Sequence, residues 1–87
     1  MDKTRVAQEF GIVLKSLREE RGLSQEKLAL EADVDRSFLS KMERGIRQPS
    51  ITILFKLCGP LDCPPEDLIA SLRPKARIRA LILTLRI

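Results

Sequence analysis

The residues best suited to binding chemistry are basic and lie close together near the middle of the chain. Residues 36 to 47 contain a single acid and four basic residues: Arg36, Lys41, Arg44 and Arg47. Guanidinium and ammonium groups neutralise phosphates, and a helix that presents them can also donate hydrogen bonds to the edges of bases. Charge alone does not distinguish a DNA-binding patch from an ordinary solvated surface, because both carry such charges equally often. The spacing of the neighbouring apolar residues has to distinguish them.

Catalytic chemistry is disfavoured. The chain has no histidine, no glycine-rich phosphate loop, and no nucleophile placed with a base at a plausible spacing. Its only cysteines, Cys58 and Cys63, cannot complete a four-ligand zinc site without histidine. We therefore expect no enzyme activity, no metal and no cofactor. The cysteines are interpreted as reduced core residues, with a redox sensor as the minor alternative.

The charge is unevenly distributed along the chain, whose net value is +4. Residues 73 to 87 contain five basic residues and no acid, so residues 1 to 72 carry 11 basic against 12 acidic side chains and sum to −1. Aromatic residues make up only 3%, with no Trp and no Tyr. This disfavours proteins that bind single strands by stacking bases on aromatic rings. The composition therefore argues against RNA-binding folds of that kind.

Apolar periodicity predicts two helices before the basic cluster. The first runs from about residue 3 to 21 and ends at Gly22, because apolar residues recur at helical spacing in it: Val6, Phe10, Val13, Leu14 and Leu17. A second, short helix is capped by the hydroxyl of Ser24. Its narrow apolar stripe consists of Leu28, Ala29 and Ala32.

Two further helices follow a tight polar connection. Asp35 is expected to cap a third helix that ends at Gly45, with an inward face of Phe38, Leu39 and Met42. Ser50 is expected to cap a fourth helix, and Gly59-Pro60 should break it, so that its end comes early or is kinked. Its predicted apolar residues are Ile51, Leu54, Phe55, Leu57 and Cys58.

A fifth short helix begins at Pro65, a residue suited to the first helical position, and its apolar side is Leu68, Ile69 and Leu72. The sequence therefore predicts a compact all-α domain of five helices over residues 1 to 72, with residues 73 to 87 as a C-terminal extension. In that extension, Ile78, Leu81, Ile82 and Leu85 fit a helix, but a strand is also compatible with the apolar run.

The order of the capped helices and the residues between them form a recognisable motif. The segments that carry it are Ser24-Gln25-Glu26-Lys27-Leu28-Ala29, Val34-Asp35-Arg36-Ser37-Phe38-Leu39-Ser40-Lys41-Met42-Glu43-Arg44-Gly45, and Arg47-Gln48-Pro49-Ser50. This pattern resembles the lambda-repressor-like (Cro/C1 or XRE-type) helix-turn-helix family, from about Phe10 to Ile69. The chain departs from the family at Asp33 and Asp62, where glycine is common, and at Gly59-Pro60.

The resemblance implies that the third helix, about residues 36 to 44, lies in the major groove of DNA as the recognition helix. The residues it implies for reading bases are Arg36, Ser37 and Lys41. The residues it implies for holding the DNA backbone are Ser24, Gln25, Arg44, Arg47 and Gln48. A buried ion pair that pins the recognition helix is implied between Arg18 and Glu43, with two ordinary surface charges as the alternative.

Regulators of this kind bind palindromic DNA as symmetric dimers, so we expect a homodimer. The apolar extension at residues 75 to 87 is the expected pairing segment, and a membrane-surface helix or a disordered end is the alternative. No run approaches the roughly 18 apolar residues of a membrane span, so a cytoplasmic protein without a membrane partner is expected.

The resemblance thus implies a sequence-specific transcriptional regulator. Two other interpretations stay open: an antitoxin that also binds a toxin, and a controller of a restriction-modification system. RNA polymerase is a further candidate partner. The amino-acid sequence does not determine whether the protein activates or represses transcription, which operator it binds or which genes it controls. These properties depend on the promoter DNA.

Overall fold

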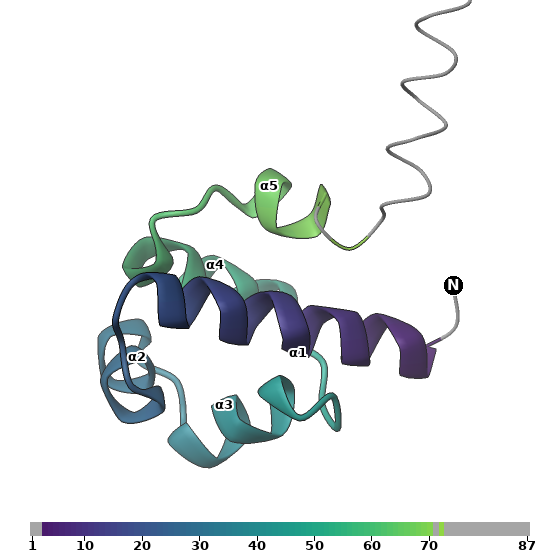
Figure 1. Cartoon of the computed structure of the whole chain (residues 1–87), viewed down its shortest axis with the longest axis horizontal. Helices are drawn as coiled ribbons and strands as arrows, with labels where there is room; N and C mark the ends of the chain where they lie inside the picture. Colours follow the sequence, from purple (N-terminus) through teal and green to yellow (C-terminus); the bar gives the residue numbers. More distant parts are fainter. Residues whose placement is uncertain (1–2, 71, 73–87) are drawn as a thin grey trace, which may run out of the picture.

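A computed structural model describes residues 3–70 and 72 of the chain. The described part is all-α, as predicted, and in Figure 1 α1 crosses the middle of the view, with α3 below it and α5 above it. Helix α1 packs against α3, α3 against α2, α2 against α4, and α4 against α5. The helices are α1 Lys3–Glu20, α2 Gln25–Ala32, α3 Arg36–Glu43, α4 Ile51–Leu61 and α5 Pro65–Ala70.

Three helices begin at the capping residues that the sequence predicts. The Ser24 hydroxyl accepts a hydrogen bond from the Lys27 amide at 3.0 Å, and the Ser50 hydroxyl accepts one from the Ile53 amide at 3.1 Å. Asp35 caps α3 by accepting from two amides, at 2.7 and 3.2 Å. These bonds satisfy amides that have no partner within the helix, so the starts of α2, α3 and α4 are fixed locally.

Helices α1 to α4 also end alike, because the two residues after each helix donate hydrogen bonds back into its last turn. The chain turns there through left-handed backbone at Gly22, Asp33, Gly45 and Asp62, with φ of 67, 56, 77 and 51°. A Cβ atom makes this conformation costly, and aspartate is among the residues that tolerate it best. Asp33 and Asp62 therefore fill turn positions that glycine usually takes.

We predict that Asp33→Gly stabilises the domain by about 0.5 to 1 kcal/mol, because glycine adopts the left-handed conformation without steric cost. The lost carboxylate contacts only Lys56, at 3.7 Å across an exposed pair, which contributes little. The Lys56 ammonium keeps its bond to the Asp33 carbonyl oxygen. Thermal unfolding followed by circular dichroism should show a higher midpoint for Asp33→Gly and a lower one for Asp33→Ala. A lower midpoint for both variants would contradict this reading of the turn.

The prediction that Gly59-Pro60 breaks α4 is wrong, because the helix continues through both residues to Leu61. Proline clashes with the Cβ of the residue before it in a helix, and Gly59 has no Cβ. Pro60 lies in the last turn, so only one backbone hydrogen bond is lost. The extra residue gained, Leu61, is fully buried, and burying a leucine contributes about 1.5 to 3 kcal/mol.

One hydrophobic core joins all five helices, formed by Phe10, Leu14, Leu28, Ala29, Ala32, Leu39, Met42, Leu54, Leu57, Leu61 and Leu68. Most predicted core residues are in it or packed against it. Three predictions are wrong: Ile51 is 71% exposed, Phe55 is 60% exposed and Ile69 is 47% exposed. Helix α4 buries the row Leu54, Leu57 and Leu61, and Ile51 and Phe55, four residues apart, lie on a different face of the helix.

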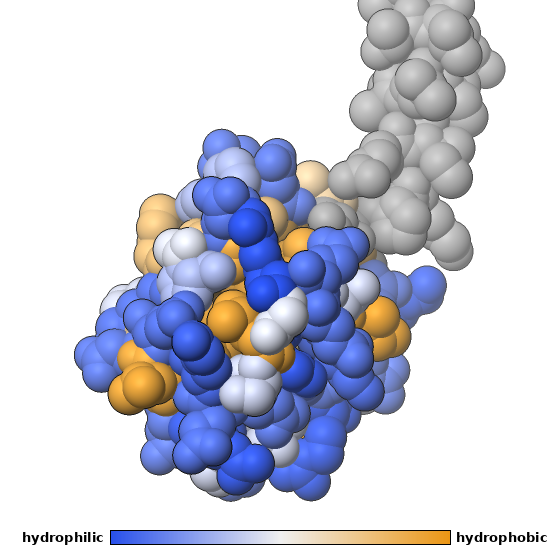
Figure 2. All heavy atoms as spheres, turned by 60° about the vertical axis from the view of Figure 1, so that its left-hand side comes forward, coloured by the Kyte–Doolittle hydropathy of each residue, from blue (hydrophilic) through white to orange (hydrophobic). Residues whose placement is uncertain are grey.

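The face shown in Figure 2 is mostly hydrophilic and carries separate apolar patches. Within residues 3–70 and 72, no helix is both long and apolar enough to cross a membrane. The predicted C-terminal extension, 73 to 87, with its proposed pairing segment, lies outside the described residues.

Candidate nucleic-acid interface

Helix α3 separates an inner apolar side from an outer polar side. Leu39 and Met42 are fully buried against the core. Ser37 and Arg44 are exposed and Lys41 is half-buried, and their spacing of four and then three residues places all three on the outer face. Arg36 is exposed as well but lies seven residues before Glu43, nearer the side that faces α2. The three predicted base-reading residues are therefore accessible, with Arg36 at the flank.

Helix α3 is held against α1 at a contact that the sequence analysis missed. Gly11 is buried in the middle of α1, and a Cβ atom there would lie 2.5 Å from the Met42 carbonyl oxygen and 2.7 Å from that of Glu43. The two backbones can approach this closely only because residue 11 has no side chain. A glycine inside a strongly periodic helical segment was the available signal, because glycine is unfavourable in a helix unless packing requires it.

A second contact between α1 and α3 is the ion pair between Arg18 and Glu43. The guanidinium donates to both carboxylate oxygens, at 2.6 and 3.0 Å, and also to the Leu23 carbonyl oxygen at 2.8 Å. The side chains are only 12% and 3% exposed. Two parallel bonds fix orientation as well as distance, so the pair sets the angle of α3 on the scaffold.

Gln25 joins this network from the first turn of α2, because its side-chain amide donates to Glu43 Oε1 at 3.0 Å. One carboxylate thus connects α1, α2 and α3. Hydrogen bonding to Glu43 raises the pKa of Arg18, and this outweighs the lowering effect of burial. The guanidinium of Arg18 therefore stays charged at neutral pH.

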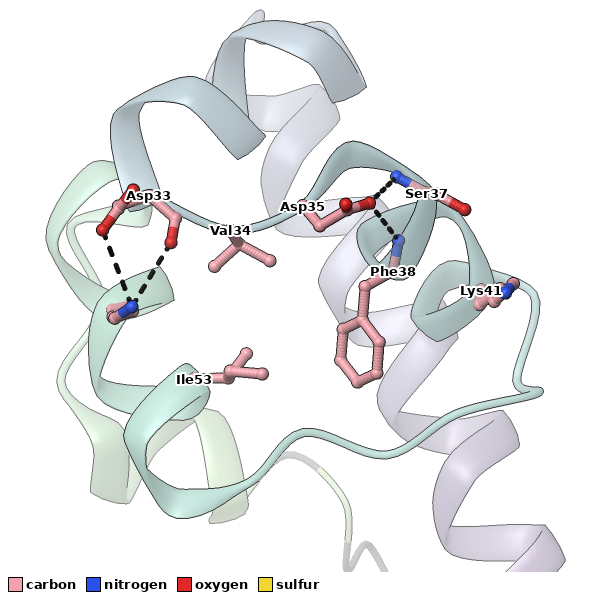
Figure 3. Close-up of a pocket in the computed structure, with 8 residues that line it drawn as sticks. Asp33, Val34, Asp35, Ser37, Phe38, Lys41 and Ile53 are labelled. Atoms are coloured by element: carbon pink, nitrogen blue, oxygen red, sulfur yellow. Dashed lines mark hydrogen bonds and ion pairs between the residues drawn. The ribbon is translucent and has the colours of Figure 1, made fainter.

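A groove of about 470 Å³ runs along one side of α3, between that helix, the preceding turn and α4. Figure 3 shows the side chains of Val34, Phe38 and Ile53 converging on it. Its lining also includes two carboxylates, of Asp33 and Asp35, and two ammonium groups, of Lys41 and Lys56, so the groove carries no excess of either charge.

A second groove, of about 720 Å³, lies on the other side of α3, and Phe38 and Lys41 line both. The remaining lining residues are Thr4, Ala7, Gly45, Ile46, Arg47 and Gln48. Arg47 is exposed and Gln48 half-buried. The loop is held in place because the Ile46 amide donates to the Lys41 carbonyl oxygen at 2.9 Å. No carboxylate is among the lining residues, so this groove suits the phosphate backbone of DNA.

The opposite end of the interface is formed by the start of α2. Ser24 is exposed there and Gln25 is half-buried. The Ser24 oxygen serves as the cap, and a hydroxyl that accepts a bond still has a proton to donate. Across the described residues, no cluster of three potential metal ligands is present, and both cysteines are free.

Comparison with known proteins agrees with this geometry. The Helix-turn-helix family model (HTH_3) matches residues 14–68. Control protein C.BamHI of Bacillus amyloliquefaciens is 38% identical over 61 residues, which is 69% of this chain and 75% of that protein. Control protein C.MunI of a Mycoplasma species is 38% identical over 64 residues, 72% of this chain and 86% of that protein.

A solved structure gives the same picture. The restriction-modification controller protein C.AhdI of Aeromonas hydrophila superposes with a TM-score of 0.69 at 42% identity, covering 71% of this chain and 94% of that one. The family is one of non-enzymatic regulators of the Cro/C1 or XRE type. The chain therefore belongs to the helix-turn-helix family of DNA-binding transcriptional regulators.

Proposed function

We propose that the chain binds a specific duplex operator with α3 in the major groove, where Arg36, Ser37 and Lys41 contact base edges. The observation that carries this is the exposed polar face of α3 on a helix whose inner side is fixed by Gly11 and by the Arg18–Glu43 pair. A rigid helix can hold donors in register with base edges. An arginine or lysine on such a helix pairs best with guanine, so the half-sites should contain guanine.

Residues at two places would hold the DNA backbone. Ser24 and Gln25 stand at the amino end of α2, and the loop that carries Arg44, Arg47 and Gln48 follows α3. The second groove has basic residues and no carboxylate in its lining, whereas the first has two of each charge, and this difference favours a backbone path along the loop. Such contacts set affinity and position but read no sequence.

In vitro selection from random duplex DNA, at two salt concentrations, tests specific recognition. The wild-type protein should enrich a palindrome whose half-sites are centred about one helical turn, or a multiple of it, apart. The Arg36→Ala/Lys41→Ala variant should lose the enrichment while keeping its fold by circular dichroism. Absence of enrichment for the wild type, or binding that disappears uniformly with salt, would contradict the proposal and favour a protein-interaction module.

The genes under control are proposed to be those of a restriction-modification system in the same cytoplasm. This rests on the relatives, whose printed names describe control proteins and restriction-modification controllers and whose lengths the chain largely spans. The selected palindrome should then lie upstream of neighbouring endonuclease and methyltransferase genes, and a promoter fusion should respond to the protein. A toxin gene beside the regulator, with a complex between the two proteins, would instead support an antitoxin.

We also propose a homodimer, because one recognition helix contacts too few base pairs to select a site in a genome. Exposed apolar side chains on α4 and α5, namely Ile51, Phe55 and Ile69, offer a surface for it. We predict that Ile51→Lys/Phe55→Lys weakens self-association about tenfold or more, measured by sedimentation. Deleting residues 75 to 87 tests the pairing segment expected from the sequence. A monomeric wild type, or a dimer that neither change affects, would contradict this.

A further inference from the structure

The end of α4 brings two thiols onto one closed turn. Cys58 lies in the last turn of the helix, and the amide of Cys63, just beyond it, donates to the Cys58 carbonyl oxygen at 3.2 Å. Standard bond lengths on either side of this contact place the two α-carbons about 5 to 7 Å apart. Disulfides span α-carbon distances of about 4.4 to 6.8 Å, so the backbone is already close to the geometry of a disulfide.

The side chains of the two cysteines also lie on the same side of the turn. Both are half-buried and both pack against the same hydrophobic core, as expected for residues at these two positions of such a helix end. Burial raises the pKa of the Cys58 thiol most, and the charge of Cys63 raises it further. In the reduced protein the Cys63 thiol donates a weak hydrogen bond to the Pro64 carbonyl oxygen, at 3.6 Å.

This turn is held from outside by Arg21. Its guanidinium donates to the Leu61 carbonyl oxygen at 3.2 Å and to the Asp62 carboxylate at 2.7 Å. Asp62 between the cysteines adopts the left-handed conformation, which closes the turn. Non-covalent contacts thus hold the turn that brings the backbones of the two cysteines together.

We propose that Cys58 and Cys63 form a dithiol that closes reversibly to an intramolecular disulfide by exchange with a small-molecule disulfide such as oxidised glutathione. One cysteine thiolate attacks the glutathione disulfide, forms a mixed disulfide and releases one glutathione thiolate. The other cysteine thiolate attacks the protein sulfur of that mixed disulfide and releases the second glutathione. Two protein thiols are oxidised and one glutathione disulfide is reduced to two thiols.

The disulfide would tie the end of α4 to the segment that leads into α5. Helix α3 packs on α1 and α2, so the polar face of α3 should keep its position after oxidation. The burial of the thiols has a kinetic consequence. Because the pKa of both thiols is raised, little thiolate is present at neutral pH, and the reaction should accelerate as the pH rises.

The test equilibrates the reduced full-length protein with mixtures of oxidised and reduced glutathione, once in native buffer and once in urea, and measures intact masses after acid quenching. The expected product is a monomer that has lost two hydrogen atoms and no longer reacts with an alkylating reagent. Its equilibrium constant should be about tenfold or more higher in native buffer than in urea, because the fold holds the thiols together. The oxidised protein should then unfold at a higher midpoint.

Cys58→Ser and Cys63→Ser are the matched controls, and each should stop at a single glutathione adduct. Three results would overturn the proposal: persistent glutathione adducts on both cysteines of the wild type, covalent dimers as the main product, or equal constants in native buffer and in urea. The experiment measures a mass and involves no DNA. A result that overturned the disulfide proposal would therefore leave the proposed operator binding unaffected.

Discussion

Gly11→Ala should destabilise the domain by about 3 kcal/mol or more. The new methyl carbon would meet two backbone carbonyl oxygens of α3, at 2.5 and 2.7 Å. These oxygens belong to the last turn of a packed helix, so they cannot move aside as a flexible side chain could. Urea unfolding followed by circular dichroism gives the free energy, and a largely unfolded variant is within expectation because small domains have only about 5 to 15 kcal/mol in total.

Whether Gly11→Ala lowers or raises the free energy of unfolding distinguishes an effect of helix packing from an effect of helix propensity. Alanine is about 1 kcal/mol more favourable than glycine in a helix, so an account without the α1–α3 contact predicts stabilisation. Ile12→Ala is the matched control, since Ile12 is the next residue of α1 and is mostly exposed. It should change stability by less than about 1 kcal/mol. A Gly11→Ala protein as stable as the wild type would show that the two helices are farther apart than described.

Glu43→Ala should cost about 3 kcal/mol, because it leaves the Arg18 guanidinium charged, mostly shielded from solvent and without its carboxylate. It also removes the acceptor of the Gln25 amide. Because folding raises the pKa of Arg18, the stability that this residue contributes is fully present at pH values below the ordinary arginine pKa. That stability would be lost only as the pH rises above the pKa of Arg18 in the folded protein. The destabilisation measured by urea unfolding should therefore be the same at pH 6 and pH 8, within about 0.5 kcal/mol.

The double variant Arg18→Met/Glu43→Leu provides the control, because apolar replacement of both partners removes the uncompensated charge. It should be more stable than Glu43→Ala. If Glu43→Ala loses less than about 1 kcal/mol, the pair behaves as a surface contact, and another contact must set the angle of α3.

The caps and turns could be predicted from sequence because they depend on local chemistry. Ser24, Asp35 and Ser50 accept bonds from amides two or three residues ahead, and any folded context leaves this geometry unchanged. The helix boundaries near them were accordingly close to those observed. The predicted Arg18–Glu43 contact came from the family resemblance, because no local pattern joins residues 25 positions apart.

The features that were missed depend on what surrounds the helix. Ile51 and Phe55 are apolar like core residues, but they lie on a different face of α4 from the buried row Leu54, Leu57 and Leu61 and are exposed. The continuation of α4 through Pro60 depends on the missing Cβ of Gly59 and on the burial of Leu61. Gly11 acquires its role only from the carbonyl oxygens of another helix.

The proposed division of roles gives sequence reading to the outer face of α3 and backbone contacts to the loop after it. Two variants that each lose one positive charge, Lys41→Ala and Arg47→Ala, test it most directly. The affinity of each variant is measured for the selected operator and for a scrambled duplex, across a range of salt concentrations. Lys41→Ala should lose about 5-fold to 150-fold in affinity for the operator and far less for the scrambled duplex. Arg47→Ala should weaken both alike and reduce the salt slope by about one. Equal losses on both duplexes for Lys41→Ala would contradict the account.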